Sequence, residues 1–361
     1  MSMRPWVRGL RPQTLPASVA PVAIGAAAAW RDLNGCGLYR FLCPWDAEGV
    51  RVPGQADVNV QEFRFGIVLA LCAAVALCLQ IAVNFANDYS DGMRGVDDGR
   101  SIDCGEMSEP VVSTGSHTSA GNVGLGNRPL TCSAPARLVA SGISPRRVLI
   151  AAGLSALMAC VCGLVVLSIT GYWWLMAVGA CCVLAGWGYT GGRHPYGYVG
   201  LGELAVFVFF GLVAVLGTQY VLCGRIDGYG VAGAVSAGLL SCVMLMINNI
   251  RDITSDSRHG KRTLAVRLGM RCARIVAAGT MVTALVPLLT LFAISVGHLP
   301  FTDGWQMFCA VGVVLLVIVA NAVLAAVTVR LIFRCDHRMA LSMSGMTLLL
   351  GAAGYIGLAL L

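Results

Sequence analysis

The sequence predicts an all-α membrane protein that crosses the bilayer about nine times. Of the 361 residues, 57% are hydrophobic and only 12% are charged, whereas about a quarter of the residues in a soluble domain are charged. The mean hydropathy is +0.76. Apolar runs of roughly 18 residues or more, with almost no charge, recur along the chain, and each is long enough to span a bilayer as a helix.

The expected helices follow one another with mostly short connections. The first run, 15–30, is rich in Ala and is interrupted by Pro16 and Pro21. The other runs cover 66–86, 148–169, 172–192, 199–222, 229–250, 275–297, 306–329 and 339–361. None of them alternates between polar and apolar residues, which excludes a membrane β-barrel. We expect residues 1–361 to form one membrane domain, with its helices around a central cavity that opens to the cytoplasm.

The distribution of positive charge predicts the orientation, because cytoplasmic loops are enriched in Lys and Arg. With a cytoplasmic N-terminus and an outside C-terminus, the cytoplasmic segments hold most of the 25 Lys and Arg residues. The net charge of +7 is therefore a topology signal and does not indicate nucleic-acid binding. The basic and then apolar N-terminus also has features of a signal peptide, but the charge distribution favours its retention as the first helix.

Two connections are long. Segment 31–65 is expected outside and contains Cys36 and Cys43, which can form a disulfide if that compartment is oxidising. Segment 92–146 is expected in the cytoplasm. Its middle, about 101–127, is rich in Gly, Ser and Asn, which predicts a flexible insertion.

A cluster of Asn and Asp residues follows the second expected helix. Asn84, Asp88 and Asp91 stand at positions i, i+4 and i+7, which lie on one face of a helix. Asn87 is next to that face. Carboxylates near the bilayer are costly, by roughly 2.5–3.5 kcal/mol each at the middle of a span, so a positive partner is expected.

A second cluster of the same type follows the sixth expected helix. Asn248, Asp252 and Asp256 stand at i, i+4 and i+8, again on one face. Two carboxylate clusters without Cys or His favour Mg²⁺, which takes oxygen ligands from carboxylates, phosphates and water. Basic residues flank both clusters, a layout that fits a bound diphosphate: Arg94, Arg100, Arg251, Lys261 and Arg262.

At these residues the sequence resembles the UbiA superfamily of intramembrane prenyltransferases. The superfamily pattern is NDxxDxxxD on the second helix and DxxxD on the sixth, followed by a stretch rich in Gly, Lys and Thr. Here the first pattern begins at Asn87 and includes Asp88 and Asp91, and the second runs from Asp252 to Asp256. The last Asp of the first pattern falls on Gly95, so the resemblance leaves open whether Asp97 or Asp98 replaces it.

Further segments resemble the 1,4-dihydroxy-2-naphthoate polyprenyltransferases of menaquinone biosynthesis. They are WVRGLRPQTLPASVAPV at 6–22, NDYSDGMRGVDD at 87–98, RLVASG at 137–142, YTGGRHPYGYVGLGE at 189–203 and NNIRDITSDSRHGKRTLAVRLG at 248–269. The resemblance implies transfer of a polyprenyl group from polyprenyl diphosphate to 1,4-dihydroxy-2-naphthoate, with release of diphosphate and CO₂, giving demethylmenaquinol. It also implies a multi-pass protein of the bacterial plasma membrane with a cytoplasmic active site and Mg²⁺ as cofactor.

The resemblance also implies roles for individual residues. Asp88, Asp91, Asp252, Asp256 and Lys261 would be catalytic, and the four carboxylates, with Asn87, would bind the metal ions. The basic residues expected to hold diphosphate are Arg137, Lys261, Arg262, Arg11, Arg94 and Arg251. For Arg11, a cytoplasmic anchor is the alternative. The residues expected near the acceptor are Tyr189, Tyr196, Tyr198 and Glu203. The alternatives are interfacial aromatic residues for the tyrosines and a structural ion pair with Arg193 for Glu203.

Two other functions remain to be distinguished. A UbiA-type enzyme with another aromatic acceptor, 4-hydroxybenzoate or haem, would share both carboxylate clusters. A transporter with acidic ion sites would usually place its charges near the membrane midplane, whereas these clusters are expected at the cytoplasmic ends of helices.

Overall fold

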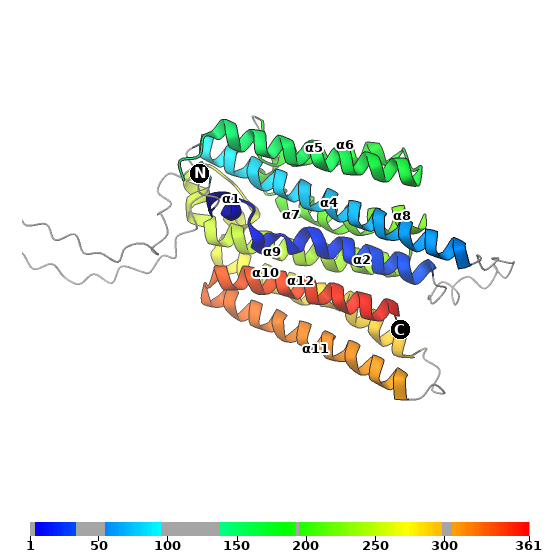
Figure 1. Ribbon diagram of the computed structural model, residues 1–361. Helices are drawn as coiled ribbons and strands as arrows, with labels where there is room; N and C mark the ends of the chain where they lie inside the picture. Colours follow the sequence, from blue (N-terminus) through cyan, green and yellow to red (C-terminus); the bar gives the residue numbers. More distant parts are fainter. Residues whose placement is uncertain are drawn as a thin grey trace, which may run out of the picture.

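The structure, a computed structural model, describes residues 4–33, 55–94, 138–139, 141–192, 195–297 and 305–360. Its described residues form helices and no strands. The long helices run side by side in one bundle, and α1 and the end of α12 lie at opposite ends of it (Figure 1). The prediction of an all-α membrane protein is confirmed.

The first half of the chain begins with α1 (Arg4–Gly9) and a short 3-10 helix, η1 (Pro12–Thr14). The bundle helices that follow are α2 (Pro16–Leu33), α4 (Gln55–Met93), α5 (Pro145–Thr170) and α6 (Leu175–Thr190). Helix α5 has Pro145 in its first turn, where the missing N–H costs nothing. It ends at Gly171, whose φ of 78° lies in the left-handed region that glycine adopts without strain.

The second half begins with a 3-10 turn, η2 (Tyr196–Val199). A continuous helical stretch follows, made of α7 (Gly202–Val206), the π-helical η3 (Phe207–Val213) and α8 (Ala214–Cys223). The remaining helices are α9 (Gly228–Arg258), α10 (Leu264–Gly297), α11 (Trp305–Arg334) and α12 (His337–Leu360). A Cβ added to Gly211 would lie 2.6 Å from Cα of Gly238, so η3 and α9 pack backbone against backbone.

Each of the nine apolar runs overlaps a helix or a continuous helical stretch of the described residues, and the nine crossings stay a prediction. Among the described helices, seven are long and apolar enough to cross a membrane. Helix α2 is not one of them, and α6 has only 16 residues. Helix α4 begins at Gln55, well before the expected 66, because a helix can continue beyond the bilayer with polar residues.

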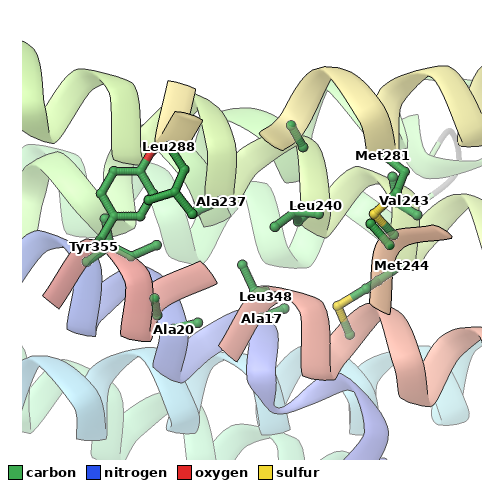
Figure 2. Packing of buried hydrophobic residues seen from close by; sticks show 14 of the residues in the cluster. Ala17, Ala20, Ala237, Leu240, Val243, Met244, Met281, Leu288, Leu348 and Tyr355 are labelled. Carbon is green, nitrogen blue, oxygen red and sulfur yellow. The ribbon is translucent and has the colours of Figure 1, made fainter. Parts of the chain in front are cut away.

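Helix α9 lies at the centre of the bundle. In its membrane-spanning window 72% of the residues are buried, against 17% in the windows of α4 and α5. Figure 2 shows its side chains packed among those of α2, α10 and α12, and the labelled residues are Ala17, Ala20, Ala237, Leu240, Val243, Met244, Met281, Leu288, Leu348 and Tyr355. This apolar core fixes the position of α9, whose C-terminal turns hold the second carboxylate cluster.

A smaller apolar cluster fixes α1 and segment 138–139 against α4. Phe85, Leu138 and Val148 are buried in it, and the ring of Trp6 meets that of Phe85 edge-on at 5.8 Å. A Cβ on Gly9 would lie 2.6 Å from Cδ1 of Leu138. The backbone of residue 138 is therefore held close to the end of α4, where the first carboxylate cluster lies.

Candidate functional site

The first carboxylate of α4 is paired with a cation from the N-terminal segment. Nη2 of Arg11 donates to Oδ1 of Asp88 at 2.5 Å, and the backbone N–H of Leu138 donates to Oδ2 at 3.3 Å. Asp88 is only 1% exposed. Arg11 adopts a left-handed backbone (φ 52°), which is uncommon for a residue with a side chain and directs the chain from α1 into η1. The backbone turn between α1 and η1 therefore positions the side chain of Arg11 beside Asp88.

The second carboxylate of α4 meets a lysine that lies 170 residues further along the chain. Nζ of Lys261 donates to Oδ1 of Asp91 at 2.6 Å and lies 3.8 Å from Oδ1 of Asp256. Lys261 is the only lysine of the chain, and it is 7% exposed. The backbone N–H of Lys261 donates to the backbone oxygen of Asp256, so the turn after α9 fixes its position. Lys261 therefore joins the two carboxylate clusters.

Tyr198 belongs to this cluster. Its hydroxyl donates to Oδ1 of Asp91 at 2.6 Å. Its ring centroid lies 4.4 Å from Nζ of Lys261 and 4.8 Å from Cζ of Arg94, distances at which a cation is attracted to an aromatic face. The backbone N–H of Arg262 donates to the backbone oxygen of Tyr198. The structure thus places Tyr198 beside the carboxylates and basic groups.

The remaining carboxylate of α9 is paired locally. Arg251 contacts the neighbouring Asp252 with two hydrogen bonds, from Nε at 2.9 Å and from Nη2 at 3.0 Å. Arg94 donates to the backbone oxygen of Gly192 at 2.9 Å, and the side chain of Arg262 is exposed. Of the basic residues expected to hold diphosphate, Arg11 and Lys261 therefore have the most direct contact with the buried carboxylates.

The residues expected near the acceptor form a neighbouring group. The rings of Tyr189 and Tyr196 meet edge-on at 5.6 Å. The hydroxyl of Tyr196 donates to the backbone oxygen of Ala185 at 2.7 Å, and burial raises the pKa of Tyr196. Oε1 of Glu203 accepts a hydrogen bond from Nδ2 of Asn249 at 2.9 Å. Asn249 was not singled out from the sequence, although it lies beside Asn248.

A hydrogen-bonded network of Thr14 with Gln80 and Asn84, which precede Asp88 on α4, was also not predicted. Nδ2 of Asn84 donates to the backbone oxygen of Leu10 at 3.0 Å, and Nε2 of Gln80 lies within hydrogen-bond distance of Asn84 and Thr14. Gln80 precedes Asn84 by one helical turn, and this spacing on the same face of α4 was the signal available in the sequence. The network ties η1 to α4 and supports the position of Arg11.

Asn87 lies half-buried on α4. Several other predicted residues have no described position. The predicted residues outside the described part of the chain are Arg137, Gly95, Asp97, Asp98, Arg100, Arg193, Cys36 and Cys43, together with the expected insertion 101–127. The question of which Asp replaces the one expected at Gly95 therefore stays open.

The donor atoms of the site suit a magnesium ion. The buried acidic groups are carboxylates, and hard oxygen ligands are those that Mg²⁺ prefers. The described residues include no group of three or more His, Cys, Asp or Glu side chains placed to hold a metal ion. Because Mg²⁺ usually takes only one or two protein carboxylates and completes its shell with phosphate oxygens and water, these residues fit an ion that binds together with a diphosphate.

Comparisons with known proteins identify the family of the chain. The chain is 42% identical over 285 residues to a 1,4-dihydroxy-2-naphthoate octaprenyltransferase of Mycobacterium tuberculosis, covering 78% of this chain and 76% of the relative. It is 40% identical over 293 residues to the enzyme of the same name from Mycobacterium leprae, covering 79% and 78% of the two chains.

The fold has a solved counterpart as well. A UbiA homologue from Archaeoglobus fulgidus, solved with bound DMAPP and Mg²⁺, superposes with a TM-score of 0.50 at 12% identity, covering 97% of this chain and 99% of that one. The sequence profile of the UbiA prenyltransferase family matches residues 126–355, which include the carboxylates of α9. This multi-pass membrane protein belongs to the UbiA prenyltransferase family.

Proposed function

We propose that this protein transfers a polyprenyl group from polyprenyl diphosphate to 1,4-dihydroxy-2-naphthoate. The allylic C–O bond breaks, a carbon of the aromatic ring takes the prenyl carbon, and diphosphate and CO₂ leave, which gives demethylmenaquinol. The names of the relatives at 42% and 40% identity support this acceptor. The observation that supports the chemistry most directly is the convergence of Asp88, Asp91 and Asp256 with Arg11 and Lys261.

The diphosphate is proposed to bind between the two carboxylate clusters. Asp88 and Asp91, with Asn87, would hold one Mg²⁺, and Asp252 and Asp256 another. The ions would stabilise the negative charge that develops on the leaving diphosphate. Arg11 and Lys261 would bind the diphosphate oxygens directly. The other basic residues proposed to assist are Arg94, Arg137, Arg251 and Arg262.

The acceptor is proposed to lie beside this group. Tyr189 and Tyr196 form an aromatic pair, which would stack on the naphthoate and shield the allylic carbon from water. Glu203, held by Asn249, would orient an acceptor hydroxyl. For Tyr198 we propose a different role from that implied by the resemblance: its contacts with Asp91 and Lys261 favour diphosphate binding over acceptor binding.

The expected setting is a bacterial plasma membrane with a cytoplasmic N-terminus, an outside C-terminus and a cytoplasmic active site. The positive charges of the loops support this orientation. Since α1 and Arg11 lie at the same end of the bundle as the carboxylates, a cytoplasmic N-terminus implies a cytoplasmic site. We also propose that residues 1–361 act as one membrane domain with an insertion at about 101–127.

An acceptor competition tests the proposal. Membranes containing the protein are incubated with Mg²⁺, labelled polyprenyl diphosphate and, separately, 1,4-dihydroxy-2-naphthoate, 4-hydroxybenzoate or haem. We expect a decarboxylated prenyl product from the naphthoate only. Transfer to hydroxybenzoate or haem alone would assign a different acceptor to the site, and movement of substrate across the membrane without any product would favour a transporter.

A further inference from the structure

The buried carboxylates of the site already hold cations that belong to the chain itself. Asp88 contacts Arg11 at 2.5 Å, and Asp91 contacts Lys261 at 2.6 Å. Lys261 also lies 3.8 Å from Asp256. The three carboxylate residues are 1%, 3% and 5% exposed. Two side-chain cations, Arg11 and Lys261, therefore lie against three carboxylates that water hardly reaches.

We propose that Arg11 and Lys261 are internal counter-ions that exchange partners during binding. In the ligand-free protein they offset two of the three negative charges of Asp88, Asp91 and Asp256. When Mg²⁺ and a diphosphate bind together, the metal ion takes over the carboxylates, and the guanidinium and the ammonium transfer to the diphosphate oxygens. This inference rests on the proposed function, because it adds a second role to the residues of the same site.

Burial is the reason that such counter-ions are needed. An isolated ionised carboxylate in a low-dielectric interior is strongly disfavoured unless an opposite charge lies next to it. Without Lys261, Asp91 and Asp256 would bring two negative charges together with little solvent to screen them. The lysine thus reduces the repulsion between Asp91 and Asp256 before substrate arrives.

The same pairing makes Mg²⁺ a poor ligand by itself. To reach the carboxylates, a lone metal ion must displace a buried ammonium or guanidinium, which is then left near a second positive charge. A diphosphate removes this penalty, because its oxygens receive the displaced cations through strong charge-assisted hydrogen bonds. Metal and diphosphate should therefore bind with strong mutual dependence, which by linkage is equal in both directions.

Tyr198 defines the resting position of the lysine. Its hydroxyl donates to the same Oδ1 of Asp91 that accepts from Lys261, and its ring lies 4.4 Å from the ammonium. A cation that leaves Asp91 can stay in contact with the face of the ring. The ammonium can therefore stay in contact with the aromatic ring while it moves from the carboxylate to the diphosphate.

The test measures Mg²⁺ binding without any prenyl transfer. The full chain is purified in detergent micelles, and its dissociation constant for Mg²⁺ alone is determined by calorimetry for the wild type and for Lys261→Gln. Because the variant lacks a competing cation, we expect it to bind Mg²⁺ at least about tenfold more tightly than the wild type does. Unchanged or weaker binding by Lys261→Gln would overturn the proposal.

Two control variants separate the exchange from a general effect of charge. Lys261→Arg keeps the cation, so its affinity for Mg²⁺ alone should stay close to that of the wild type. Arg271→Gln removes an exposed positive charge from α10, and we expect less than about a twofold change, because salt screens exposed charges. A tenfold gain in Arg271→Gln would also contradict the proposal, since net charge would then explain the result.

A second measurement adds inorganic diphosphate. In the wild type it should strengthen Mg²⁺ binding strongly, and in Lys261→Gln this mutual dependence should fall by at least about tenfold. If Lys261→Gln does not survive purification, Arg11→Gln provides the same measurement at Asp88, with the same expected gain and the same contradicting result. None of these measurements involves the acceptor. If the proposed acceptor is wrong, the partner exchange can still be correct. If the Mg²⁺ affinity of the variant is unchanged, the partner exchange is wrong, but the proposed acceptor is not affected.

Discussion

The two carboxylate clusters differ in where their positive partners come from. On α4, Asp88 and Asp91 are paired with Arg11 and Lys261, which lie 77 and 170 residues away in the chain. On α9, Asp252 is paired with the adjacent Arg251. The pairs of α4 therefore hold the N-terminal segment and the α9–α10 turn in place, whereas the Arg251–Asp252 pair itself joins no segments that are distant in the chain. Removal of the cation should therefore lower stability more in the cluster on α4 than in the cluster on α9.

Of Arg11, Tyr198 and Arg251, Arg11 is expected to have the largest effect on stability. In Arg11→Gln the buried Asp88 loses its cation, and breaking a pair of this kind, with a partly exposed arginine, should lower the free energy of unfolding by about 2 to 3 kcal/mol. The free energy is measured by SDS titration in mixed micelles. Arg11→Lys restores the charge and should recover most of the loss. A stability equal to that of the wild type in Arg11→Gln would show that Asp88 needs no partner.

Tyr198→Phe should have an intermediate effect. The variant keeps the ring beside Lys261 and Arg94 but loses the hydrogen bond to Asp91. A hydrogen bond to a charged group contributes about 1.5 kcal/mol or somewhat more, and the same SDS titration should report a loss of that size. Tyr198→Leu also removes the contacts between the ring and the cations, so it should lose more. Equal losses in the two variants would mean that these contacts contribute nothing.

Arg251→Gln should change stability by less than about 1 kcal/mol, because the pair joins two neighbouring residues of α9 and its loss separates no distant segments of the chain. The comparison with Arg11→Gln, in the same assay, tests the difference between the clusters most simply. A loss at Arg251 as large as that at Arg11 would mean that the local pair also supports the tertiary fold.

The smallest effect is expected at Asn249. In Asn249→Leu the carboxylate of Glu203 loses one hydrogen bond, and the KM for 1,4-dihydroxy-2-naphthoate should rise about two- to fivefold, with a smaller change in kcat. The KM for polyprenyl diphosphate should not change. An equal rise in both KM values would indicate a general disturbance of α9, and Asn249→Gln, which can still donate, should lie closer to the wild type.

Much of the fold followed from the sequence because apolar runs report directly on burial in a bilayer. The helix boundaries were less accessible. Helix α9 continues from the expected 250 to Arg258, because the Asn and Asp residues of its cluster extend the helix beyond the apolar run. The π-helical turn at Phe207–Val213 was not predicted, since it depends on the close approach of Gly211 to Gly238.

The residue types of the site were predictable from the sequence, but which cation pairs with which carboxylate was less so. Helical spacing placed Asp88 and Asp91 on one face, and the lone lysine was a clear candidate partner. Sequence patterns alone do not match Lys261 to Asp91 or Arg11 to Asp88, because these pairs depend on how α1, α4 and α9 meet in space. The position of Tyr198 beside Asp91 depends in the same way on the turn before α7.

The central claim is that both carboxylate clusters serve one prenyl-transfer site. The most direct measurement compares the rate of Mg²⁺-dependent prenyl transfer to 1,4-dihydroxy-2-naphthoate in Asp88→Asn and Asp252→Asn with that of the wild type, at equal amounts of inserted protein. We expect each variant to lose at least about 100-fold in rate, because each removes a charge that acts on the leaving diphosphate. Wild-type activity in either variant would contradict the claim that its cluster belongs to the site.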